Sequence, residues 1–249
     1  MRTEVSYFNK RSTSYRKEYD RETPEGYSFR VRREKVLALS PERCDVIDIA
    51  SGPGVMIPGL LKKHCRITCV DAAPEMIART KEEYADTLNV EAIVADAYAL
   101  PFPDARFDTA LSMGLIEYLE DQGTFLDEAA RILKPGGIFI VTFPNYTSPW
   151  RAFNRFALYL KSFVRPARAI DEDNVTHREY HRNEAIALLA KHGLETRKVV
   201  YYNFKLIPYP LDRWLPRLTV LQSTLCEYLA HTPLRFFGTG FIVEALRRA

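Results

Sequence analysis

Small residues and carboxylates follow one another at a spacing that can hold a ligand against bare backbone. The segment Asp48-Ile49-Ala50-Ser51-Gly52-Pro53-Gly54 leads from an apolar stretch into a tight turn, and Val55–Lys63 behind it has the pattern of a helix opening. Glycines let a ligand approach the amides of such a strand–turn–helix junction closely. The segment 48–54 therefore predicts a binding loop, and the rest of the chain must decide its ligand.

Two further carboxylates end apolar segments downstream of this loop. Asp71 follows the segment 66–70, and Asp96 follows the segment 90–95. Since ligands of open α/β sheets bind at the carboxyl ends of the strands, we expect both carboxylates to lie beside the turn 48–54. This edge of the sheet is the expected place for a cofactor.

The turn departs from two common nucleotide-binding fingerprints. The dinucleotide pattern Gly-x-Gly-x-x-Gly needs a third glycine where this chain has Ile57. No Gly-Lys-Ser/Thr sequence follows, which argues against a nucleoside-triphosphate loop. What accompanies the turn instead is Leu133-Lys134-Pro135-Gly136-Gly137, a strong turn signal before another apolar segment.

The elements that must position these residues alternate between strands and helices. Strands are predicted over 45–49, 66–70, 90–95, 107–113 and 138–143, with helices over 28–39, 74–84 and 121–133. Strands that are nearly continuously apolar and alternate with helices favour a parallel sheet covered on both faces. The expected fold is therefore α/β, Rossmann-like and doubly wound.

The last hundred residues follow a different pattern. A helix is predicted over 151–164, where arginines and a lysine separate apolar residues at helical spacing. Further helices are predicted over 182–192 and 215–229, and strands over 197–204 and 240–245. The helix 215–229 carries Leu218, Leu221, Leu225 and Tyr228 on one face.

The composition is that of an ordinary globular protein. Of 249 residues, 47% are hydrophobic and 27% charged, and the formal net charge of +3 is too small to argue for a nucleic-acid partner. No apolar run reaches membrane-spanning length, and the polar start of the chain does not resemble a signal peptide. The four cysteines form no Cys-x-x-Cys pair, which favours a reduced, cytoplasmic protein.

Taken together, the turn 48–54, Asp71, Asp96 and the turn 133–137 resemble the class I S-adenosylmethionine-dependent methyltransferases. The resemblance is closest to the small-molecule branch, methyltransferase type 11, which includes the ubiquinone-biosynthesis O-methyltransferases, and it covers residues 27–145 well. It implies S-adenosyl-L-methionine as cofactor and a seven-stranded sheet, mostly parallel with an antiparallel last strand.

The resemblance also implies how one domain, residues 1–249, is divided. We expect an N-terminal arm or lid over 1–30 and a cofactor-binding core over 31–145. A helical lid insertion after strand five over 146–180 and the remainder of the sheet with the acceptor pocket over 181–249 complete the domain.

Matching residues take the family's roles in this comparison. Gly52 and Gly54 would admit the amino-acid part of the cofactor, Asp71 would accept both ribose hydroxyls, and Asp96 would accept the adenine amino group. The cofactor-binding residues expected in this way are Arg30, Asp48, Ala50, Ser51, Gly52, Gly54, Asp71, Ala72, Met76, Asp96, Ala97 and Met113. Of these, Arg30 matches an arginine that holds the cofactor's carboxylate, and Asp48 organises the loop or receives its ammonium group. Relatives usually have glycine in place of Ala50 and often cysteine in place of Ser51.

Each of these residues also has a purely structural interpretation. Asp48 could brace the loop, Asp71 and Asp96 could cap strand ends, Arg30 could be a surface charge and Met113 a core residue. His177 and His181 stand four apart without a third ligand, so no metal site is expected. The segment 143–146, Phe-Pro-Asn-Tyr, superficially resembles the Asn-Pro-Pro-Tyr box of amino-methyltransferases, but its order and its place after strand five argue against that function.

The cofactor implied by the resemblance carries an electrophilic sulfonium methyl group, so the protein's task is to align an acceptor and exclude water. A hydroxyl acceptor also needs help in losing its proton. We prefer His177 as the catalytic base, because its ordinary pKa suits the task, with Tyr118 as the second catalytic candidate. The candidates considered are Glu117, Tyr118, His177, Tyr180 and His181.

The acceptor pocket is expected from residues 1–30, 146–180 and 205–235, which are rich in apolar and aromatic residues with interspersed arginines. We hypothesise a small apolar or lipid-like acceptor, with or without an acidic group, methylated at oxygen. Methylation of nitrogen or carbon, a nucleic-acid or protein substrate, and a non-catalytic S-adenosylmethionine-binding protein are the alternatives. The low net charge and the lack of an appended binding module count against nucleic acid.

The basic amphipathic stretch 151–168 leads to one further hypothesis, peripheral contact with a membrane. The alternative is that its apolar face packs on the sheet. The sequence leaves open whether the protein is a monomer or a homodimer.

Overall fold

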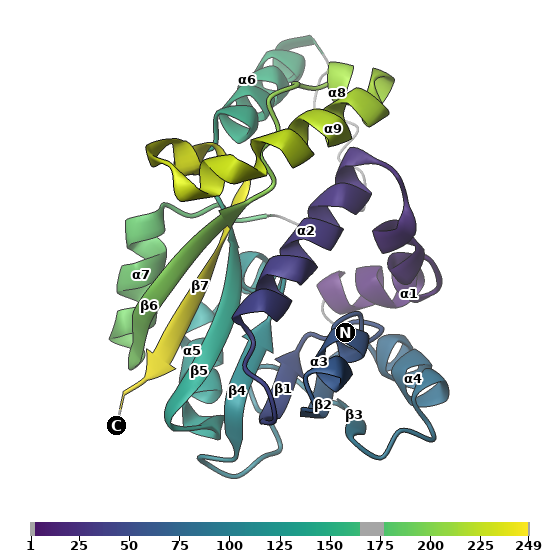
Figure 1. Cartoon of the computed structure of the whole chain (residues 1–249), viewed down its shortest axis with the longest axis vertical. Coiled ribbons are helices and arrows are strands. Elements are labelled where there is room, and N and C mark those ends of the chain that lie inside the picture. Colours follow the sequence, from purple (N-terminus) through teal and green to yellow (C-terminus); the bar gives the residue numbers. More distant parts are fainter. Residues whose placement is uncertain (1–2, 165–176, 249) are drawn as a thin grey trace.

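A seven-stranded sheet forms the centre of the computed structural model, which describes residues 3–164 and 177–248 (Figure 1). The strand order is β3-β2-β1-β4-β5-β7-β6. Strands β1 to β5 are parallel to one another, whereas β7 runs antiparallel to both β5 and β6. The strands are β1 (Asp45–Ile49), β2 (Arg66–Asp71), β3 (Val90–Val94), β4 (Phe107–Ser112), β5 (Leu133–Pro144), β6 (Leu194–Tyr202) and β7 (Gly240–Arg247). The predicted fold class is confirmed.

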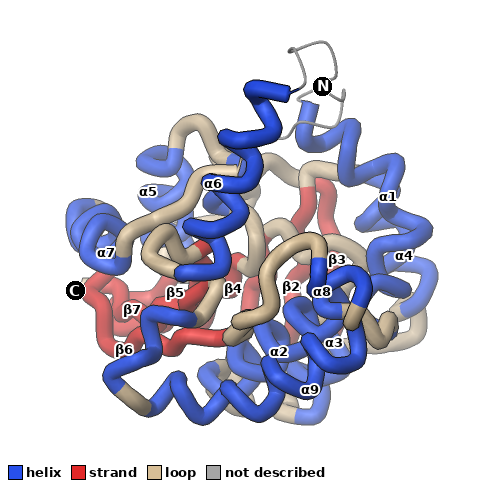
Figure 2. Tube along the Cα trace, turned by 90° about the horizontal axis from the view of Figure 1, so that it is seen from above, coloured by secondary structure: helices blue, strands red, loops and turns tan. Residues whose placement is uncertain are grey.

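Helices cover both faces of this sheet (Figures 1 and 2). They are α1 (Thr3–Asp20), α2 (Pro24–Leu39), α3 (Ile57–Lys62), α4 (Pro74–Glu83), α5 (Gln122–Ile132), α6 (Pro149–Val164), α7 (Arg182–Lys191), α8 (Leu211–Trp214) and α9 (Pro216–Cys226). Three short 3-10 helices, η1 (Ile116–Tyr118), η2 (Glu227–His231) and η3 (Pro233–Phe237), complete the list.

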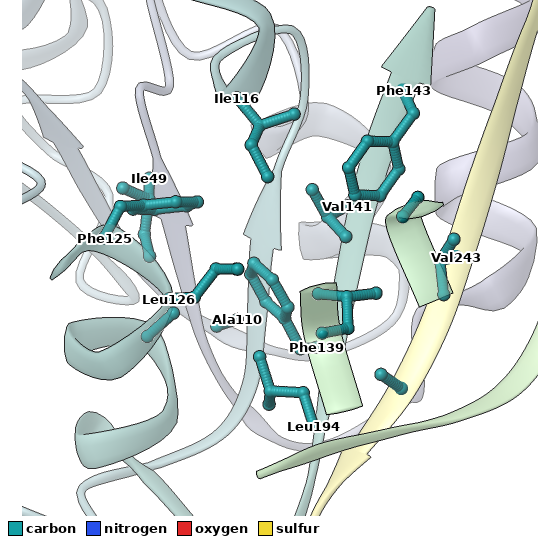
Figure 3. Packing of buried hydrophobic residues seen from close by; sticks show 14 of the residues in the cluster. Ile49, Ala110, Ile116, Phe125, Leu126, Phe139, Val141, Phe143, Leu194 and Val243 are labelled. Carbon is teal, nitrogen blue, oxygen red and sulfur yellow. The ribbon is translucent and has the colours of Figure 1, made fainter. Parts of the chain in front are cut away.

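Alternation along the strands divides the core into two clusters. Val46 of β1 joins Leu60 of α3 and Ile77 of α4 on one face. Ile47 and Ile49 point to the other face, where α5 and α7 pack. Figure 3 shows this second cluster, in which Phe125 and Leu126 of α5 lie near Ile49 and Ala110, while Phe139 and Phe143 extend the cluster along β5.

Local signals explain several helix boundaries. The Thr23 side chain accepts a hydrogen bond from the Gly26 amide, and Pro24 stands in the first turn of α2, where its missing N–H costs nothing. Asp121 caps α5 in the same way through the Thr124 amide. Pro216 disfavours the helical conformation at Leu215, which separates α8 from α9, and the predicted helix 215–229 is formed by α9 and η2.

One expectation about secondary structure is wrong, and the N-terminal arm gains a defined structure. Residues 133–137 were expected to form a turn but are the first part of β5, because Leu133 pairs with Phe107 of β4. The N-terminal arm is an 18-residue helix, α1, that packs against α2 and α4. Tyr19 of α1 stacks on Phe29 of α2 with 5.2 Å between ring centroids, so α1 has its own apolar contact with the body of the protein.

Several apolar side chains of α6 are exposed among those that the structure describes. Phe153, Phe156 and Leu160 are all exposed, so the alternative in which these residues pack on the sheet is wrong. The structure describes the predicted lid insertion 146–180 only to residue 164 and from residue 177, and residues 165–168 of the predicted membrane-contact stretch lie outside the described residues. In the described part of the chain, no helix is long and apolar enough to cross a bilayer.

Candidate cofactor and acceptor site

The turn after β1 is built from residues in left-handed backbone conformations. Ala50, Gly52 and Gly54 have φ values of 60°, 54° and 72°. Such a conformation costs an L-residue with a Cβ roughly 1–2 kcal/mol, which Ala50 bears and the glycines avoid. A Cβ at Gly54 would also lie 2.5 Å from Cδ1 of Ile57, so glycine is required there for space as well.

Asp71 ties the end of β2 to this turn. Its Oδ2 accepts a hydrogen bond from the Gly52 amide at 2.9 Å, and its Oδ1 accepts one from the Ala73 amide at 2.8 Å. Burial raises the pKa of Asp71, and the two amide bonds oppose that rise. Each carboxylate oxygen accepts two hydrogen bonds, so both keep capacity for a ligand hydroxyl.

A cavity of about 640 Å³, hereafter the larger cavity, opens at the carboxyl ends of β1 to β4. Its size lies within the usual range for small-molecule sites. Val5, Phe8 and Tyr15 of α1 form part of its wall. Eight of the twelve predicted cofactor residues line it: Ala50, Gly52, Asp71, Ala72, Met76, Asp96, Ala97 and Met113.

The other four predicted residues lie behind the wall or away from it. The Arg30 guanidinium donates to the backbone carbonyls of Tyr19 and Arg21, so it joins α1 to α2 and does not line the larger cavity. Ser51 is buried under the turn, and its amide donates to the carbonyl of Val70. Gly54 packs on Ile57 and Thr80.

Asp48 is buried in the sheet next to Cys69 of β2 and Leu111 of β4. It is 1% exposed, and its Oδ2 has no hydrogen-bond partner within the described part of the chain. Burial, together with the nearby Asp71 carboxylate, raises the pKa of Asp48 to about 8. This carboxyl group is therefore buried in its neutral form at the end of β1 and does not line the larger cavity.

Arg32 is the arginine of α2 that lines a cavity. The sequence pattern did not distinguish it from Arg30 as a cofactor-binding residue. Its Nη1 lies 3.0 Å from the position that a Cβ at Gly114 would occupy, and its Cζ lies 5.3 Å from the centre of the Phe29 ring. Its Nε is buried without a hydrogen-bond partner among the described residues. A buried guanidinium beside a glycine, with one nitrogen that has no partner among these residues, can still donate to an anionic group.

A second cavity of about 290 Å³, hereafter the smaller cavity, adjoins the larger one. The two share Phe8, Tyr15, Gly114 and Tyr118 as wall residues. Other polar residues of the smaller cavity come from α1, α2, η1, β5, α6 and the chain around β6 and β7: Tyr7, Arg11, Glu18, Ser28, Arg32, Glu117, Thr142, Arg151, His177, Tyr202 and Thr239.

Glu117 is a buried carboxyl group in the wall of the smaller cavity. It is 7% exposed, and its Oε2 has no partner among the described residues. Burial raises the pKa of Glu117, while Arg32 and Arg151 act in the opposite direction. A buried carboxyl group with a raised pKa is a candidate for proton transfer.

His177 and Tyr118 meet across the smaller cavity. The Tyr118 hydroxyl and His177 Nε2 are 3.4 Å apart, and their ring centroids are 4.6 Å apart. Partial burial of the ring and the charge of Arg151 lower the pKa of His177, so the imidazole is neutral at pH 7. Burial raises the pKa of Tyr118, so its phenol stays protonated.

The remaining candidates for a base lie outside both cavities. Tyr180 is fully buried and donates its hydroxyl proton to the carbonyl of Ile116. His181 precedes α7 and packs on the ring of Tyr146 at 4.4 Å. Among the residues that the structure describes, no group of three or more His, Cys, Asp or Glu side chains can hold a metal ion.

The sheet order, the glycine turn after β1 and the carboxylates after β2 and β3 agree with the resemblance to the class I S-adenosylmethionine-dependent methyltransferases. Residues 47–141 match the family described as methyltransferase domain. The resemblance predicted from the sequence is therefore confirmed, and with it S-adenosyl-L-methionine as the cofactor that the class implies.

Individual relatives agree with this class. The chain is 29% identical over 178 residues to malonyl-[acyl-carrier protein] O-methyltransferase of Geobacter sulfurreducens, covering 67% of this chain and 62% of that protein. It is 33% identical over 108 residues to 2-methyl-6-phytyl-1,4-hydroquinone methyltransferase 1 of Oryza sativa, covering 42% and 32%. The chain thus spans less than two thirds of the length of either relative.

A solved S-adenosylmethionine-dependent methyltransferase of Thermotoga maritima has the same fold. Its TM-score is 0.66, with 20% identity over 97% of this chain and 98% of that one. This likeness extends over the whole sheet, including β6 and β7, which lie beyond the matched family domain.

Proposed function

We propose that this protein transfers a methyl group from S-adenosyl-L-methionine to the oxygen of a small apolar or lipid-like acceptor bound in the smaller cavity. One observation carries the proposal: the cavity lined by the glycine turn, Asp71 and Asp96 shares four wall residues with a second, polar cavity. A molecule in the smaller cavity therefore lies beside a cofactor in the larger one, as group transfer requires.

The residues of the larger cavity fit the cofactor. Asp71 has free acceptor capacity for ribose hydroxyls, and Asp96 with Ala97 forms the part of the wall assigned to adenine. The cofactor's methionine carboxylate is assigned to Arg32, which lines the smaller cavity beside the shared wall residue Gly114, in place of Arg30, since Arg30 is engaged by two carbonyls and the Nε of Arg32 has no partner among the described residues. When bound, the cofactor supplies an electrophilic methyl group on sulfur.

The residues of the smaller cavity support proton removal from a hydroxyl acceptor. Neutral His177 is the assigned base, and the Tyr118 hydroxyl beside it positions the acceptor oxygen by hydrogen bonding. Phe8, Tyr15 and Phe29 add apolar surface that favours a hydrophobic acceptor body. Methylation at oxygen also agrees with the name of the Geobacter relative, an O-methyltransferase.

The same proposal includes where the protein acts. All four cysteines are free thiols, which suits the reducing cytoplasm. The lid roles of residues 1–30 and 146–180 belong to this proposal, supported by the α1 residues in both cavity walls. Peripheral membrane contact through 151–168, by a monomer or homodimer, is supported by the exposed Phe153, Phe156 and Leu160.

Formation of S-adenosylhomocysteine tests the proposal directly. The protein is incubated with S-adenosyl-L-methionine and, in turn, hydroxylated aromatic amphiphiles, matched amines, and O-methylated forms of the same compounds. We expect product only with free hydroxyls, and loss of at least tenfold in rate for Tyr118→Phe or His177→Ala. Turnover of the amines alone would contradict oxygen as the target, and cofactor binding without turnover on any hydroxyl compound would contradict the catalytic proposal.

A further inference from the structure

Helix α9 exposes large apolar side chains and buries polar ones, the reverse of the usual arrangement in a globular protein. Trp214, Leu218, Leu221, Leu225 and Tyr228, hereafter the α9 ridge, follow one another at spacings of three and four residues, and all are between 51% and 72% exposed. This spacing places Leu218, Leu221 and Leu225 on one face of α9, while Trp214 ends α8 and Tyr228 lies in η2, so these two residues flank the leucines along the chain. Large apolar side chains in one exposed stripe are the mark of an interaction surface.

The opposite face of α9 explains why the helix sits this way. Thr219 and Ser223 are its buried residues, and both are polar. Gln222 fixes the helix to the chain after β6, since its amide nitrogen donates to the carbonyl of Phe204 and its oxygen accepts from the Leu206 amide. The two hydrogen bonds of Gln222 therefore fix α9 in the orientation in which its leucines face outward.

The exposed charges of the chain segment that carries the α9 ridge have one sign. In residues 206–237, all of which the structure describes, the exposed Asp, Glu, Lys and Arg side chains are Arg213, Arg217 and Arg235. Asp212 is 3% exposed, and Glu227 pairs with Lys35 at 3.0 Å. The partner of this surface must therefore be apolar where it meets the leucines and negative at its margin.

We propose that the α9 ridge docks on the surface of a bilayer that contains anionic phospholipid, with α9 lying in the plane of the interface. An apolar stripe bordered by arginines is the pattern of interfacial helices. Trp214 and Tyr228 stand at the two ends of the leucine stripe, and amphipathic rings of this kind prefer the headgroup level. Such docking depends only on this surface and is independent of methyl transfer.

Two features favour a bilayer over a protein partner. A second copy of the chain would bring two arginine-bordered ridges together, and residues 206–237 offer no exposed acid to pair with these arginines. Helix α6 also exposes Phe153, Phe156 and Tyr159, and it lies with α8 and α9 at one end of the molecule (Figure 1). Two separate helices with exposed aromatic or aliphatic residues at one end fit a broad surface such as a membrane.

Vesicle sedimentation of the full chain tests the proposal. We expect sedimentation with vesicles of phosphatidylcholine mixed with phosphatidylglycerol, and little with phosphatidylcholine alone. Leu221→Glu combined with Leu225→Glu should lower the affinity at least tenfold. The matched control is Leu88→Glu, since Leu88 is fully exposed in the loop before β3 and should leave binding unchanged. Arg213→Gln and Arg217→Gln should each lower the affinity about fivefold, from ~1 kcal/mol per arginine near an anionic surface.

Tryptophan fluorescence gives a second measurement. With Trp150→Phe, Trp214 is the only remaining tryptophan, and its emission should shift to shorter wavelength when anionic vesicles are added. All of the substituted side chains except that of Trp150 are exposed, so the thermal unfolding midpoint of the ridge variants should match that of the parent.

Three outcomes would overturn the proposal. The first is binding to anionic vesicles that the double glutamate variant leaves unchanged. The second is no vesicle binding by the parent chain, which would favour an acidic protein partner. The third is a dimer in solution, measured by light scattering, that the double glutamate variant converts to a monomer, because the ridge would then be covered by a second copy.

Discussion

The Gly52 amide donates to Asp71 Oδ2 at 2.9 Å, which joins the turn after β1 to the end of β2. This bond makes one carboxylate serve two purposes, since it fixes the backbone of the glycine turn and faces the larger cavity. Loss of the Asp71 carboxylate should therefore affect both the shape of the turn and the affinity for the cofactor.

Ala50 should make the turn less stable than it would be with glycine. Its φ of 60° lies in the left-handed region, which glycine adopts without steric cost. We expect Ala50→Gly to raise the free energy of unfolding by about 1 kcal/mol in urea titrations. Gly54→Ala is the opposite control and should lower it, because the new methyl group meets Ile57. Equal stability of Ala50→Gly and the parent would show that the turn relaxes around alanine.

Asp48 should make stability fall as pH rises. Its folded pKa of about 8 lies above the ordinary value of 3.8, so between these values the folded protein keeps a proton that the unfolded chain releases. The free energy of unfolding should drop with a slope of up to ~1.4 kcal/mol per pH unit over this window. Asp48→Asn should leave stability near pH 4 unchanged and raise it at pH 8. An unchanged pH profile in the variant would contradict the neutral state assigned to Asp48.

Arg32 and Arg30 should differ in their effect on cofactor binding. They stand two residues apart on α2, so they point in nearly opposite directions. We expect Arg32→Met to weaken S-adenosylhomocysteine binding by 10-fold to 100-fold, from the ~1.5–3 kcal/mol of a charged hydrogen bond. Arg30→Met should change it less than threefold, measured by calorimetry. The reverse order would restore the role that the sequence assigned to Arg30.

His177 should set the acid side of the rate profile. Its pKa is lowered by partial burial and by Arg151, so the base is available below its ordinary pKa of 6.5. With any acceptor that turns over, the rate should rise with pH, and the midpoint of this rise should lie below pH 6.5. Arg151→Gln should move the midpoint to higher pH, because one of the charges that lower the pKa is removed. A midpoint that Arg151→Gln leaves in place, and that Glu117→Gln abolishes, would assign the base to Glu117.

Much of the core was predictable because its residues carry local signals. Asp45–Ile49 is buried at every position and was correctly placed as a strand, and Asp71 was correctly placed at the end of the next one. Eight predicted cofactor residues meet in one cavity, since strands of one parallel sheet bring their carboxyl ends together. The positions of these strands along the chain, and the gathering of their carboxyl ends, were thus predictable from the sequence.

The direction in which particular side chains point could not be predicted from the sequence in the same way. Arg30, Arg32 and Arg33 form one basic stretch, and only the packing of α2 against α1 decides which guanidinium faces a cavity. The stripe of Leu218, Leu221 and Leu225 has the spacing of a buried face, yet the polar anchors of α9 turn it outward. Tertiary contacts settle both cases, and the local pattern is equally compatible with either arrangement.

The central claim is that the larger cavity binds S-adenosyl-L-methionine through Asp71. Calorimetric titration of the parent, Asp71→Asn and Asp71→Ala with S-adenosyl-L-methionine tests it most directly, with thermal unfolding of each protein measured alongside. The account predicts saturable binding to the parent and at least tenfold weaker binding to both folded variants. Equal affinity in the parent and in Asp71→Ala, with all three proteins folded, would contradict it.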